Sequence, residues 1–250
     1  MADIAVLLKQ VPDTNAKIVV NGGRVDESAV NKWSMSPFDE YALEAALGQG
    51  GSITAITCGP ERAKKMLTDA AAVGATDLMH IVVDDLSALD SNQIATILAA
   101  AVEKSGASVV FCGKQAADTN AGSTGPGVAE MMGAGCVTMV SELTGDSSGF
   151  MALRPSSSGM ERVSVSAPCV IAFDKMGTEL RRPNVKGIMM AKKKAVETLT
   201  VADLGLDIGS ASINLDNQSP PAEKPAGQKF EGAENVPTVV AKLRDEAKVI

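Results

Sequence analysis

The chain alternates short runs of consecutive hydrophobic residues with longer segments in which hydrophobic residues recur at helical spacing. A hydrophobic run of about four to eight residues, bounded by turn residues, is typical of a strand buried on both faces of a sheet. Such runs predict strands at residues 3–9, 52–59, 77–84 and 107–113 and in "CVTMVSEL". The segment 17–26 predicts a hairpin that turns at Gly22-Gly23.

Helices are predicted between these strands. Ser36 can cap the first one, Pro37 suits its first position, and the acidic residues that follow favour the positive end of the helix dipole. A second helix lies in "PERAKKMLTDAAAVGA" and another around "GVAEMMG". A helix also starts at Asp90, which forms a capping-box pattern with Gln93. Its apolar face at helical spacing comprises Ile94, Ile97, Leu98, Ala101 and Val102.

This alternation of strands and helices predicts an α/β fold, a doubly wound, mostly parallel, Rossmann-like sheet. Right-handed crossovers bring the loops that follow the strands to one edge, where ligands bind in such sheets. Three loops meet this condition: "KQVPDT" after the first strand, "CGPE" after the second, and "GKQAADTNAGSTGPG", residues 113–127, after the fourth.

The pattern changes after about residue 145. The next segment predicts short strands and turns that form an antiparallel extension of the sheet. A stretch rich in Pro, Gly and charge then leads to a C-terminal helix with apolar residues at 239, 240, 243 and 247. We therefore predict a nucleotide-binding domain at 1–200 and an arm plus helix at 201–250. Because the helix has little core of its own, we expect it to dock on a partner subunit or back on the domain.

Composition excludes several classes of protein. The net charge of −7 argues against a nucleic-acid-binding protein, which needs a basic surface. No apolar run reaches the roughly 18 residues of a membrane span, and the N-terminus lacks the pattern of a signal peptide, so we expect a cytoplasmic protein without a targeting peptide or membrane insertion. The cysteines, Cys58, Cys112, Cys136 and Cys169, are too far apart for a metal knuckle, and we expect buried, reduced thiols.

The segment 113–127 is the strongest candidate for chemistry. It offers backbone N–H groups and hydroxyls, its glycines allow close approach of a ligand, and a helix N-terminus follows, all of which suit a phosphate. It matches neither the P-loop pattern nor GxGxxG after the first strand, so a plain loop remains an alternative. A nucleophilic role for Ser123 is disfavoured, because the run is not G-x-S-x-G and the chain's one histidine, His80, falls in another strand. No metal site or paired carboxylates are predicted.

Several motifs together resemble one family. "KQVPDT", "SMSPFDEYALEAAL", "TCGPERAKKMLTDAAAVGA", "GKQAAD" and "GIMMAKKK" fall in the order and spacing of the electron-transferring flavoprotein (ETF) beta subunit, over nearly the whole chain. The resemblance implies an electron carrier without an acid–base catalytic site, which forms a heterodimer with the ETF alpha subunit and shares its FAD. It also implies a nucleotide in the beta subunit, AMP in respiratory members and a second FAD in electron-bifurcating members.

The resemblance carries over nucleotide-binding positions residue by residue. They are Leu7, Lys9, Ser36, Pro37, Phe38, Asp39, Cys58, Gly113, Ala116, Asp118, Asn120, Gly122, Ser123 and Thr124. For Phe38 the family also implies a place near the flavin ring, whereas core packing is the alternative. Ser123 and Asn120 depart from the family, which has Gln and Asp at these positions. "KQVPDT" resembles bifurcating members and Thr124 resembles AMP-binding ones; on balance we expect AMP.

The segment before the basic run Lys192–Lys194 resembles the family's recognition loop, which docks on partner dehydrogenases. Val185 stands at the position of the anchoring leucine, and Ile188 and Met189 follow it; internal packing of Val185 is the alternative. The implied function is electron transfer from a dehydrogenase, such as an acyl-CoA dehydrogenase in fatty acid oxidation, to an ETF-quinone oxidoreductase or similar membrane acceptor. The rival hypotheses are an ATP-hydrolysing enzyme and a nucleotide-sensing protein of similar fold.

Overall fold

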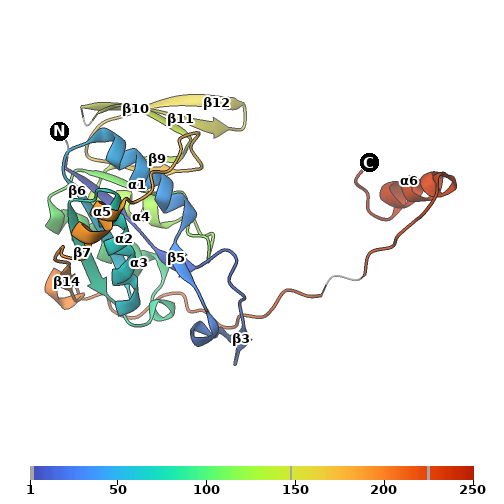
Figure 1. Ribbon diagram of the computed structural model, residues 1–250, viewed down its shortest axis with the longest axis horizontal. Helices are drawn as coiled ribbons and strands as arrows, with labels where there is room; N and C mark the ends of the chain where they lie inside the picture. Colours follow the sequence, from blue (N-terminus) through green and yellow to red (C-terminus); the bar gives the residue numbers. More distant parts are fainter. Residues whose placement is uncertain (1–2, 147, 224–225) are drawn as a thin grey trace. The chain divides into compact units, whose positions relative to one another are not determined.

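Figure 1 shows the computed structural model of the chain, which describes residues 3–146, 148–223 and 226–250. The chain forms two compact units, one that ends at Gln218 and one that begins at Ser219. The larger unit contains the predicted α/β fold. Among its described residues, the smaller unit contains a single α-helix.

The core of the larger unit is a seven-stranded sheet in which every pair of neighbouring strands is parallel. The order of strands across the sheet is β14-β7-β6-β1-β8-β13-β9. Their bounds are β1 Ile4–Leu7, β6 Ile53–Gly59, β7 Asp77–Val82, β8 Val109–Gly113, β9 Gly135–Val140, β13 Cys169–Phe173 and β14 Glu197–Leu199. The predicted doubly wound, mostly parallel sheet is therefore confirmed.

The direction in which the sheet grows reverses beside β1. The chain adds β6 and β7 on one side of β1 and then returns to add β8 on the other side. The loops that leave the carboxyl ends of β1 and β8 diverge to opposite faces at this point, which leaves a crevice between them where ligands bind in open α/β sheets. Strand order alone thus places a candidate site after Leu7 and Gly113.

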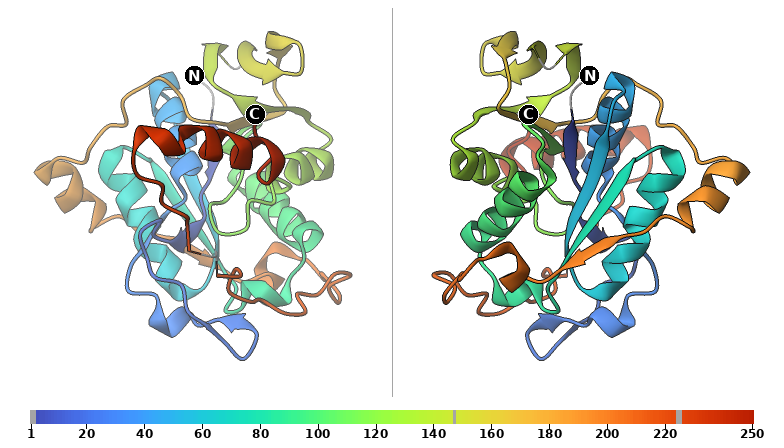
Figure 2. Two further views of the ribbon diagram at one scale, coloured as in Figure 1. Left: turned by 90° about the vertical axis from the view of Figure 1, so that its right-hand side faces the viewer. Right: turned by 90° about the vertical axis from the view of Figure 1, so that its left-hand side faces the viewer.

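Helices cover both faces of the sheet (Figure 2). On one face lie α1, Pro37–Gln49, and α2, Lys64–Val73; on the other lie α3, Ser91–Ser105, and α4, Thr124–Met132. Short 3-10 helices occur at η1 Glu27–Ala29, η2 Glu61–Ala63, η3 Leu86–Ala88, η4 Ala202–Leu204 and η5 Ala233–Asn235. The capping box predicted at Asp90 is present, with its carboxylate accepting from the backbone N–H of Gln93 and the Gln93 side chain accepting from the backbone N–H of Asp90.

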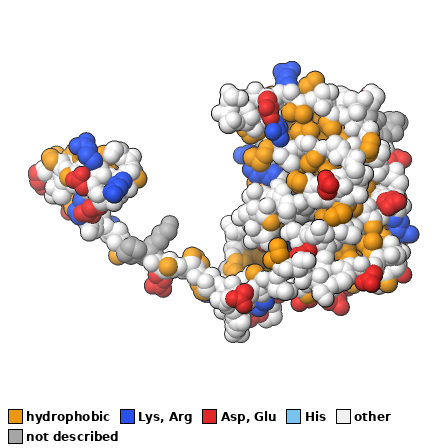
Figure 3. Space-filling view, turned by 180° about the vertical axis from the view of Figure 1, so that it is seen from behind, with side chains coloured by type: hydrophobic (Ala, Val, Ile, Leu, Met, Phe, Trp, Pro, Cys, Tyr) orange, Lys and Arg blue, Asp and Glu red, His pale blue; other side chains and the backbone are white. Residues whose placement is uncertain are grey.

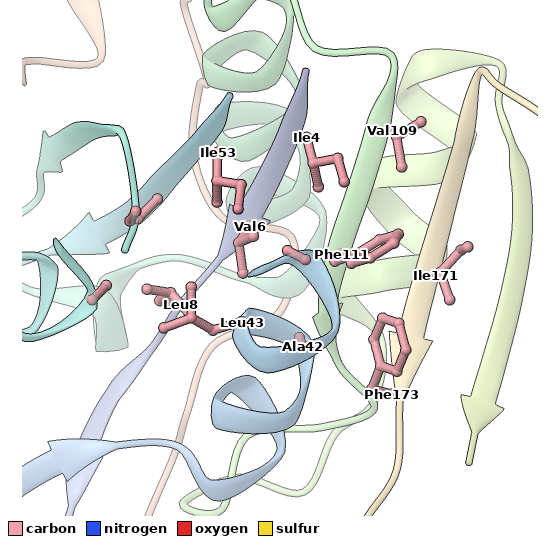
Figure 4. Packing of buried hydrophobic residues seen from close by; sticks show 14 of the residues in the cluster. Ile4, Val6, Leu8, Ala42, Leu43, Ile53, Val109, Phe111, Ile171 and Phe173 are labelled. Carbon is pink, nitrogen blue, oxygen red and sulfur yellow. The ribbon is translucent and has the colours of Figure 1, made fainter. Parts of the chain in front are cut away.

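Alternate residues of each strand face opposite helix layers, which explains why the strands are hydrophobic throughout. Ile4 and Val6 of β1 pack with α1 and α2, whereas Ala5 and Leu7 pack with α3 and α4. Figure 4 shows the first of these cores, where Phe111 of β8 lies beside Phe173 of β13 with ring centroids 5.0 Å apart. The small side chains of both helix layers let the helices lie close to the sheet.

The antiparallel strands of the second half form a sheet of their own. It consists of β10 Glu142–Asp146, β11 Gly149–Ser156 and β12 Gly159–Val165, in that order. Phe150 and Ala152 of β11 are buried in the core that contains α1, so this sheet packs on the main one rather than lengthening it. The run "PCVIAF", expected with these antiparallel strands, instead enters the main sheet as the parallel strand β13.

Four short strands form two further two-stranded antiparallel sheets. One pairs β2, Gln10–Pro12, with β5, Trp33–Met35, and the other pairs β3, Val20–Asn21, with β4, Arg24–Val25. Gly22 and Gly23 both have positive φ values, of 58° and 75°, as the predicted tight hairpin turn requires.

The segment 201–218, predicted to belong with the C-terminal arm, packs on the larger unit. The Gln93 side-chain amide donates to the carbonyls of Ile208 and Gly209, at 3.0 and 3.1 Å, and Asp90 accepts from the backbone N–H of Ser212 at 2.7 Å. Leu204, Leu206 and Ile208 pack against the core that contains α3. These residues follow β14, an edge strand that the sequence analysis did not predict, because it is only three residues long.

The smaller unit contains α6, Val236–Asp245, in the place of the predicted C-terminal helix. A Lys242–Glu246 ion pair one turn apart supports it at 2.7 Å. Its apolar residues Val236, Val240 and Leu243 are exposed. Docking of this helix on a partner subunit stays a prediction.

Hydrophobic side chains on the face of the larger unit drawn in Figure 3 gather in small patches between polar ones. Among the helices of the described residues, none is long and apolar enough to cross a membrane.

Candidate functional site

A cavity opens where the loops after β1 and β8 diverge, at the edge that the strand order indicates. One side is built from loops and from the start of α4, which present backbone groups and small side chains. The other side is an apolar wall from η3 and α3, formed by Leu86, Leu89, Ile94 and Leu98. A cavity with one apolar wall and one backbone-rich wall suits a ligand that has a flat apolar part and an anionic part.

Most of the predicted binding residues line this cavity. They are Leu7, Lys9, Asp39, Cys58, Gly113, Ala116, Gly122, Ser123 and Thr124. The remaining predicted residues, Ser36, Pro37, Phe38, Asp118 and Asn120, lie outside its lining. Residues separated by more than 100 positions, such as Leu7 and Ser123, are thus brought together by the parallel sheet.

The apolar wall was missed by the sequence analysis, together with Asp90 and Ser91. The signal was present, because the segment 83–91 follows strand β7 and therefore leaves the same edge of the sheet as the three loops that were selected. The cavity is also lined by Lys114, Gln115, Thr119, Ala121 and Gly125, which belong to the predicted segment 113–127, and by Leu8 and Cys112, which were not predicted.

Asp39 connects the two strand ends that flank the cavity. Its carboxylate accepts a hydrogen bond from the backbone N–H of Lys9 at 2.8 Å and another from that of Gly113 at 2.9 Å. One side chain thus binds the second residue beyond β1 and the last residue of β8. Asp39 is buried in the first turn of α1, where the positive end of the helix dipole favours a carboxylate. Burial nevertheless raises the pKa of Asp39 to about 7, against the two N–H donors and the charge of Lys9, which lower it.

Residue 113 has no space for a side chain, which explains why it is a glycine. A Cβ at this position would lie 2.5 Å from the Asp39 Oδ1 atom and 2.7 Å from the Phe38 Cβ atom. The start of α1 can therefore approach the end of β8 only because residue 113 carries no side chain. Gly125 has a similar role in the first turn of α4, where a Cβ would lie 3.0 Å from Cys112 Sγ, so that this helix start also lies close to the sheet.

The α4 end of the cavity offers free hydrogen-bond donors. Within the described residues, the backbone N–H groups of Gly122, Ser123 and Thr124 have no acceptor. Such N–H groups, at the positive end of a helix, are a favourable site for an anion. Gly122 adopts a positive φ of 66°, which a glycine reaches without strain.

Two lysines bring positive charge to the same cavity. The Lys9 ammonium lies 2.7 Å from the Asp118 carboxylate, and the Lys114 ammonium lies 2.9 Å from that of Asp174. The Lys114 ammonium also lies 4.7 Å from the centre of the Phe38 ring, within the range of a cation–π contact. Asp118 and Phe38 thus touch cavity residues without lining the cavity themselves.

Asn120 and Ser123, the two positions that depart from the family pattern, have different places. The Asn120 side chain accepts from the Gln115 amide at 2.8 Å, and its backbone has a positive φ of 52°, so it shapes the loop rather than facing the cavity. Ser123 lines the cavity at the N-cap position of α4, and its hydroxyl makes no capping hydrogen bond.

The expected cap at Ser36 is corrected by the structure. Ser36 does occupy the N-cap position of α1, but its hydroxyl is buried and has no hydrogen-bond partner among the described residues. The Asp39 N–H, one of the two that a capping hydroxyl could accept, donates instead to the Ser36 carbonyl at 2.9 Å.

Comparison with known proteins identifies the family. Residues 25–204 match the Electron transfer flavoprotein domain. The electron transfer flavoprotein subunit beta of Bacillus subtilis (strain 168) is 33% identical to this chain over 257 residues, which cover 99% of the chain and 100% of the relative. The protein of the same name from Homo sapiens is 31% identical, with 100% of both chains covered. The chain belongs to the electron transfer flavoprotein family, as a beta subunit.

This membership confirms the resemblance seen in the motifs. An ETF beta subunit is a component of an electron carrier. Membership as a beta subunit implies that an ETF alpha subunit is its partner. The cavity described above is then the place in this beta subunit where the family-derived positions converge.

The cysteines of this ETF beta subunit differ from the expectation at one position. Cys58, Cys112 and Cys169 are buried free thiols, as expected, and burial raises the pKa of Cys58 to about 12 and that of Cys169 to about 11. Cys136 is a free thiol too, but it is exposed, near the start of β9, which lies at the edge of the sheet.

His80 is a buried residue of β7, and its Nε2 atom lies 2.8 Å from the Gly59 carbonyl oxygen. It lies outside the cavity that contains Ser123. Among the described residues, no group of His, Cys, Asp and Glu side chains could hold a metal ion.

The segment that resembles the recognition loop contains a short helix, α5, Val185–Ala191. Val185 has 76% of its surface exposed and Met189 61%, and Ile188 is exposed as well, so Val185 does not pack internally. In the basic run that follows, the Lys194 ammonium donates to the Ala75 carbonyl at 3.1 Å, near the end of α2. Lys192 and Lys193 are exposed.

Proposed function

We propose that this beta subunit forms a heterodimer with an ETF alpha subunit, completes the binding site of an FAD held mainly by that subunit, and binds AMP in the cavity between β1 and β8. The heterodimer carries electrons from an acyl-CoA dehydrogenase to an ETF-quinone oxidoreductase or a similar membrane acceptor. The observation that carries the nucleotide assignment is the cavity itself, which opens at the switch point of the sheet and is lined by most of the family-derived positions.

The residues of the cavity fit a nucleoside monophosphate. The apolar wall of Leu86, Leu89, Ile94 and Leu98 suits an adenine ring, and the free N–H groups of Gly122, Ser123 and Thr124 suit a phosphate. Lys9 lines the cavity as well, and its ammonium, which is paired with Asp118 at 2.7 Å, can also interact with an anion there. These residues bind and orient the nucleotide and perform no proton transfer.

A second FAD is the alternative occupant. Thr124, which resembles AMP-binding members of the family and lines the cavity, supports AMP over FAD. Asn120 does not distinguish the two ligands, because both groups of the family have an aspartate at this position. Ser123 does not distinguish them either, because both groups of the family have a glutamine at its position.

Identification of the bound nucleotides tests this proposal. The chain is co-expressed with its alpha subunit, the purified heterodimer is denatured, and the released nucleotides are separated and quantified. We expect one FAD and one AMP per heterodimer. Two FAD per heterodimer would replace AMP by the bifurcating alternative, and a heterodimer without flavin would contradict the electron-carrier function.

FAD supplies the redox chemistry when it is bound, and this chain contributes a docking element for the dehydrogenase. We propose α5 for this role, with Val185, Ile188 and Met189 as the apolar contacts, because these side chains are exposed beside one another on a short helix. A small cluster of apolar residues at the centre of an interface can supply much of the binding energy of a transient complex.

Val185→Glu is expected to raise the KM of the dehydrogenase for the heterodimer by at least about tenfold, because a charge would be buried in the apolar contact without a partner. FAD and AMP contents should not change, since Val185 lies outside the cavity lining. Steady-state reduction of the heterodimer by the acyl-CoA dehydrogenase measures the KM. Thr198→Glu, a charge added at another exposed position of the same unit, is the control; unchanged kinetics in Val185→Glu would remove α5 from the docking interface.

A further inference from the structure

The helix α5 is too short to be stable by itself, since its seven residues make fewer than two turns of α-helix. Its large apolar residues do not hold it in place, because Val185, Ile188, Met189 and Met190 are all exposed. Only Ala191 is buried among the residues of this helix. The contacts that fix α5 on the larger unit must therefore be found in its backbone and in the residues that flank it.

The strongest of these contacts is the pair formed by Arg181 and Glu44. The Arg181 guanidinium donates to both oxygens of the Glu44 carboxylate, from Nε at 3.0 and 2.9 Å and from Nη2 at 2.7 Å, and the Arg181 backbone N–H donates to the same carboxylate at 3.0 Å. The Glu44 side chain is 12% exposed. Burial opposes its ionisation, but the hydrogen bonds of Arg181 outweigh this and hold the pKa of Glu44 below its usual value.

The remaining contacts fix α5 against α2. The Asn184 side chain caps α5 by accepting the Gly187 N–H at 2.7 Å. A Cβ at Gly187 would lie 2.4 Å from the Ala72 carbonyl oxygen, so the two helix backbones are in direct contact (Figure 1). Beyond the helix, Lys194 donates to the Ala75 carbonyl. The α2 contacts fix one side of α5, and Glu44 on α1 fixes the chain that enters it.

We propose that Glu44 and Arg181 are positioning residues for electron transfer from the dehydrogenase, which hold the entry to α5 so that Val185 and Met189 are presented in one fixed orientation. The proposal rests on the docking role of α5 proposed above. A four-membered set of hydrogen bonds to one carboxylate leaves the segment 181–184 little freedom, and a docking element that is already ordered loses less conformational entropy when the partner binds. Glu44 lies on the same helix as Asp39, so α1 fixes both the nucleotide cavity and the docking element.

Three variants of the intact heterodimer test this role. Arg181→Ala and Glu44→Gln each remove the pair, but they change the net charge in opposite directions. Arg182→Ala is the matched control, because it removes the same charge from the neighbouring residue, which is exposed and makes no hydrogen bond or ion pair with another described residue. Two kinds of measurement are made on the wild type and on each variant heterodimer. One is backbone amide hydrogen exchange in residues 185–191, and the other is the KM and kcat with which an acyl-CoA dehydrogenase reduces that heterodimer.

We expect faster exchange at residues 185–191 in Arg181→Ala and in Glu44→Gln, and a KM raised by about threefold to tenfold in both, with kcat and FAD content unchanged. Arg181→Lys keeps the charge but loses the two-pronged geometry. Its increases in exchange and in KM should therefore be smaller than those of Arg181→Ala but still measurable. Arg182→Ala should leave both quantities as in the wild type.

Other results would overturn the inference. Opposite changes of KM in Arg181→Ala and Glu44→Gln, or an equal effect of Arg182→Ala, would show that charge rather than position matters. Unchanged exchange at 185–191 would show that the pair does not order α5. If Val185→Glu raises KM whereas loss of the pair does not, the positioning role fails and docking through α5 stands; if Val185→Glu is also without effect, the proposed docking function fails first.

Discussion

Gly113→Ala is expected to abolish nucleotide retention and to destabilise the larger unit. The added Cβ would lie 2.5 Å from Asp39 Oδ1, 2.7 Å from Phe38 Cβ and 2.9 Å from the Asp39 backbone nitrogen. Two of these atoms belong to the backbone or lie next to it, so they cannot move away without shifting the start of α1. Overpacking of this kind costs about 1–3 kcal/mol or more.

The effect of Gly113→Ala on the nucleotide follows from geometry. If α1 moves away from β8, Asp39 no longer reaches the N–H groups of both Lys9 and Gly113, and the cavity between the two strand ends changes width. Chemical denaturation gives the free energy of unfolding, and quantification of AMP released from the purified heterodimer gives retention.

Gly48→Ala is the matched control for Gly113→Ala. It adds the same methyl group on α1, where no atom lies within 4 Å of the new Cβ. Because alanine has the higher helix propensity, this variant should be neutral or more stable by up to about 1 kcal/mol. A Gly113→Ala protein with wild-type stability and full nucleotide content would show that the close contact between α1 and β8 is not required.

Asp39→Asn is expected to weaken nucleotide binding and to change how stability depends on pH. An asparagine side chain has one acceptor oxygen, so one of the two backbone N–H groups loses its partner, at a cost of about 1–3 kcal/mol for a buried donor. Asp39→Ala removes both acceptors and should be the more severe variant. Neither change adds volume, so the effect differs in origin from that of Gly113→Ala.

The pH dependence follows from the pKa of Asp39. Burial raises this pKa in the folded protein to about 7, above the ordinary value of 3.8. The folded state therefore holds the proton more tightly than the unfolded chain, and the stability that this contributes is complete below pH ~4 and is lost as pH rises through about 7. The difference of about three units corresponds to a change on the order of 4 kcal/mol across this window.

Unfolding of the wild-type heterodimer and of Asp39→Asn at a series of pH values between 5 and 8 measures this change. The stability of the wild type relative to Asp39→Asn should fall as pH rises, because asparagine does not titrate. Asp146, which is fully exposed and has a pKa lowered chiefly by its hydrogen bond from Ser148, offers the control Asp146→Asn. Parallel pH curves for wild type and Asp39→Asn would mean that Asp39 does not titrate in this range.

Local patterns predicted the elements of this fold well. The hydrophobic runs became β1, β6, β7, β8 and β9, and the capping box at Asp90 and the turn at Gly22-Gly23 formed as predicted. Each of these signals acts within a few residues, through consecutive apolar side chains, a cap or a positive φ, so no knowledge of the rest of the chain is needed.

The predictions that needed the whole chain were less complete. The strand β14 has three residues and joins the sheet only because β7 has a free edge. The run that became β13 was assigned to the antiparallel region because its neighbours in sequence are antiparallel, whereas its hydrogen-bond partners are β8 and β9. The place of a short strand depends on which edge is vacant, and that depends on the packing of every other element.

The sequence by itself determined the alternation of strands and helices and, through several motifs in a fixed order, the ETF beta-subunit family. It also predicted the carboxyl edge of the sheet as the place of a ligand. Only the tertiary structure decided that Asp39 binds Lys9 and Gly113, residues 30 and 74 positions away, and that Glu44 holds Arg181, 137 positions away. The physical reason is that periodicity and capping are encoded between neighbours in the chain. A hydrogen bond between distant residues exists only after the sheet order and the close approach of α1 have brought its donor and acceptor together.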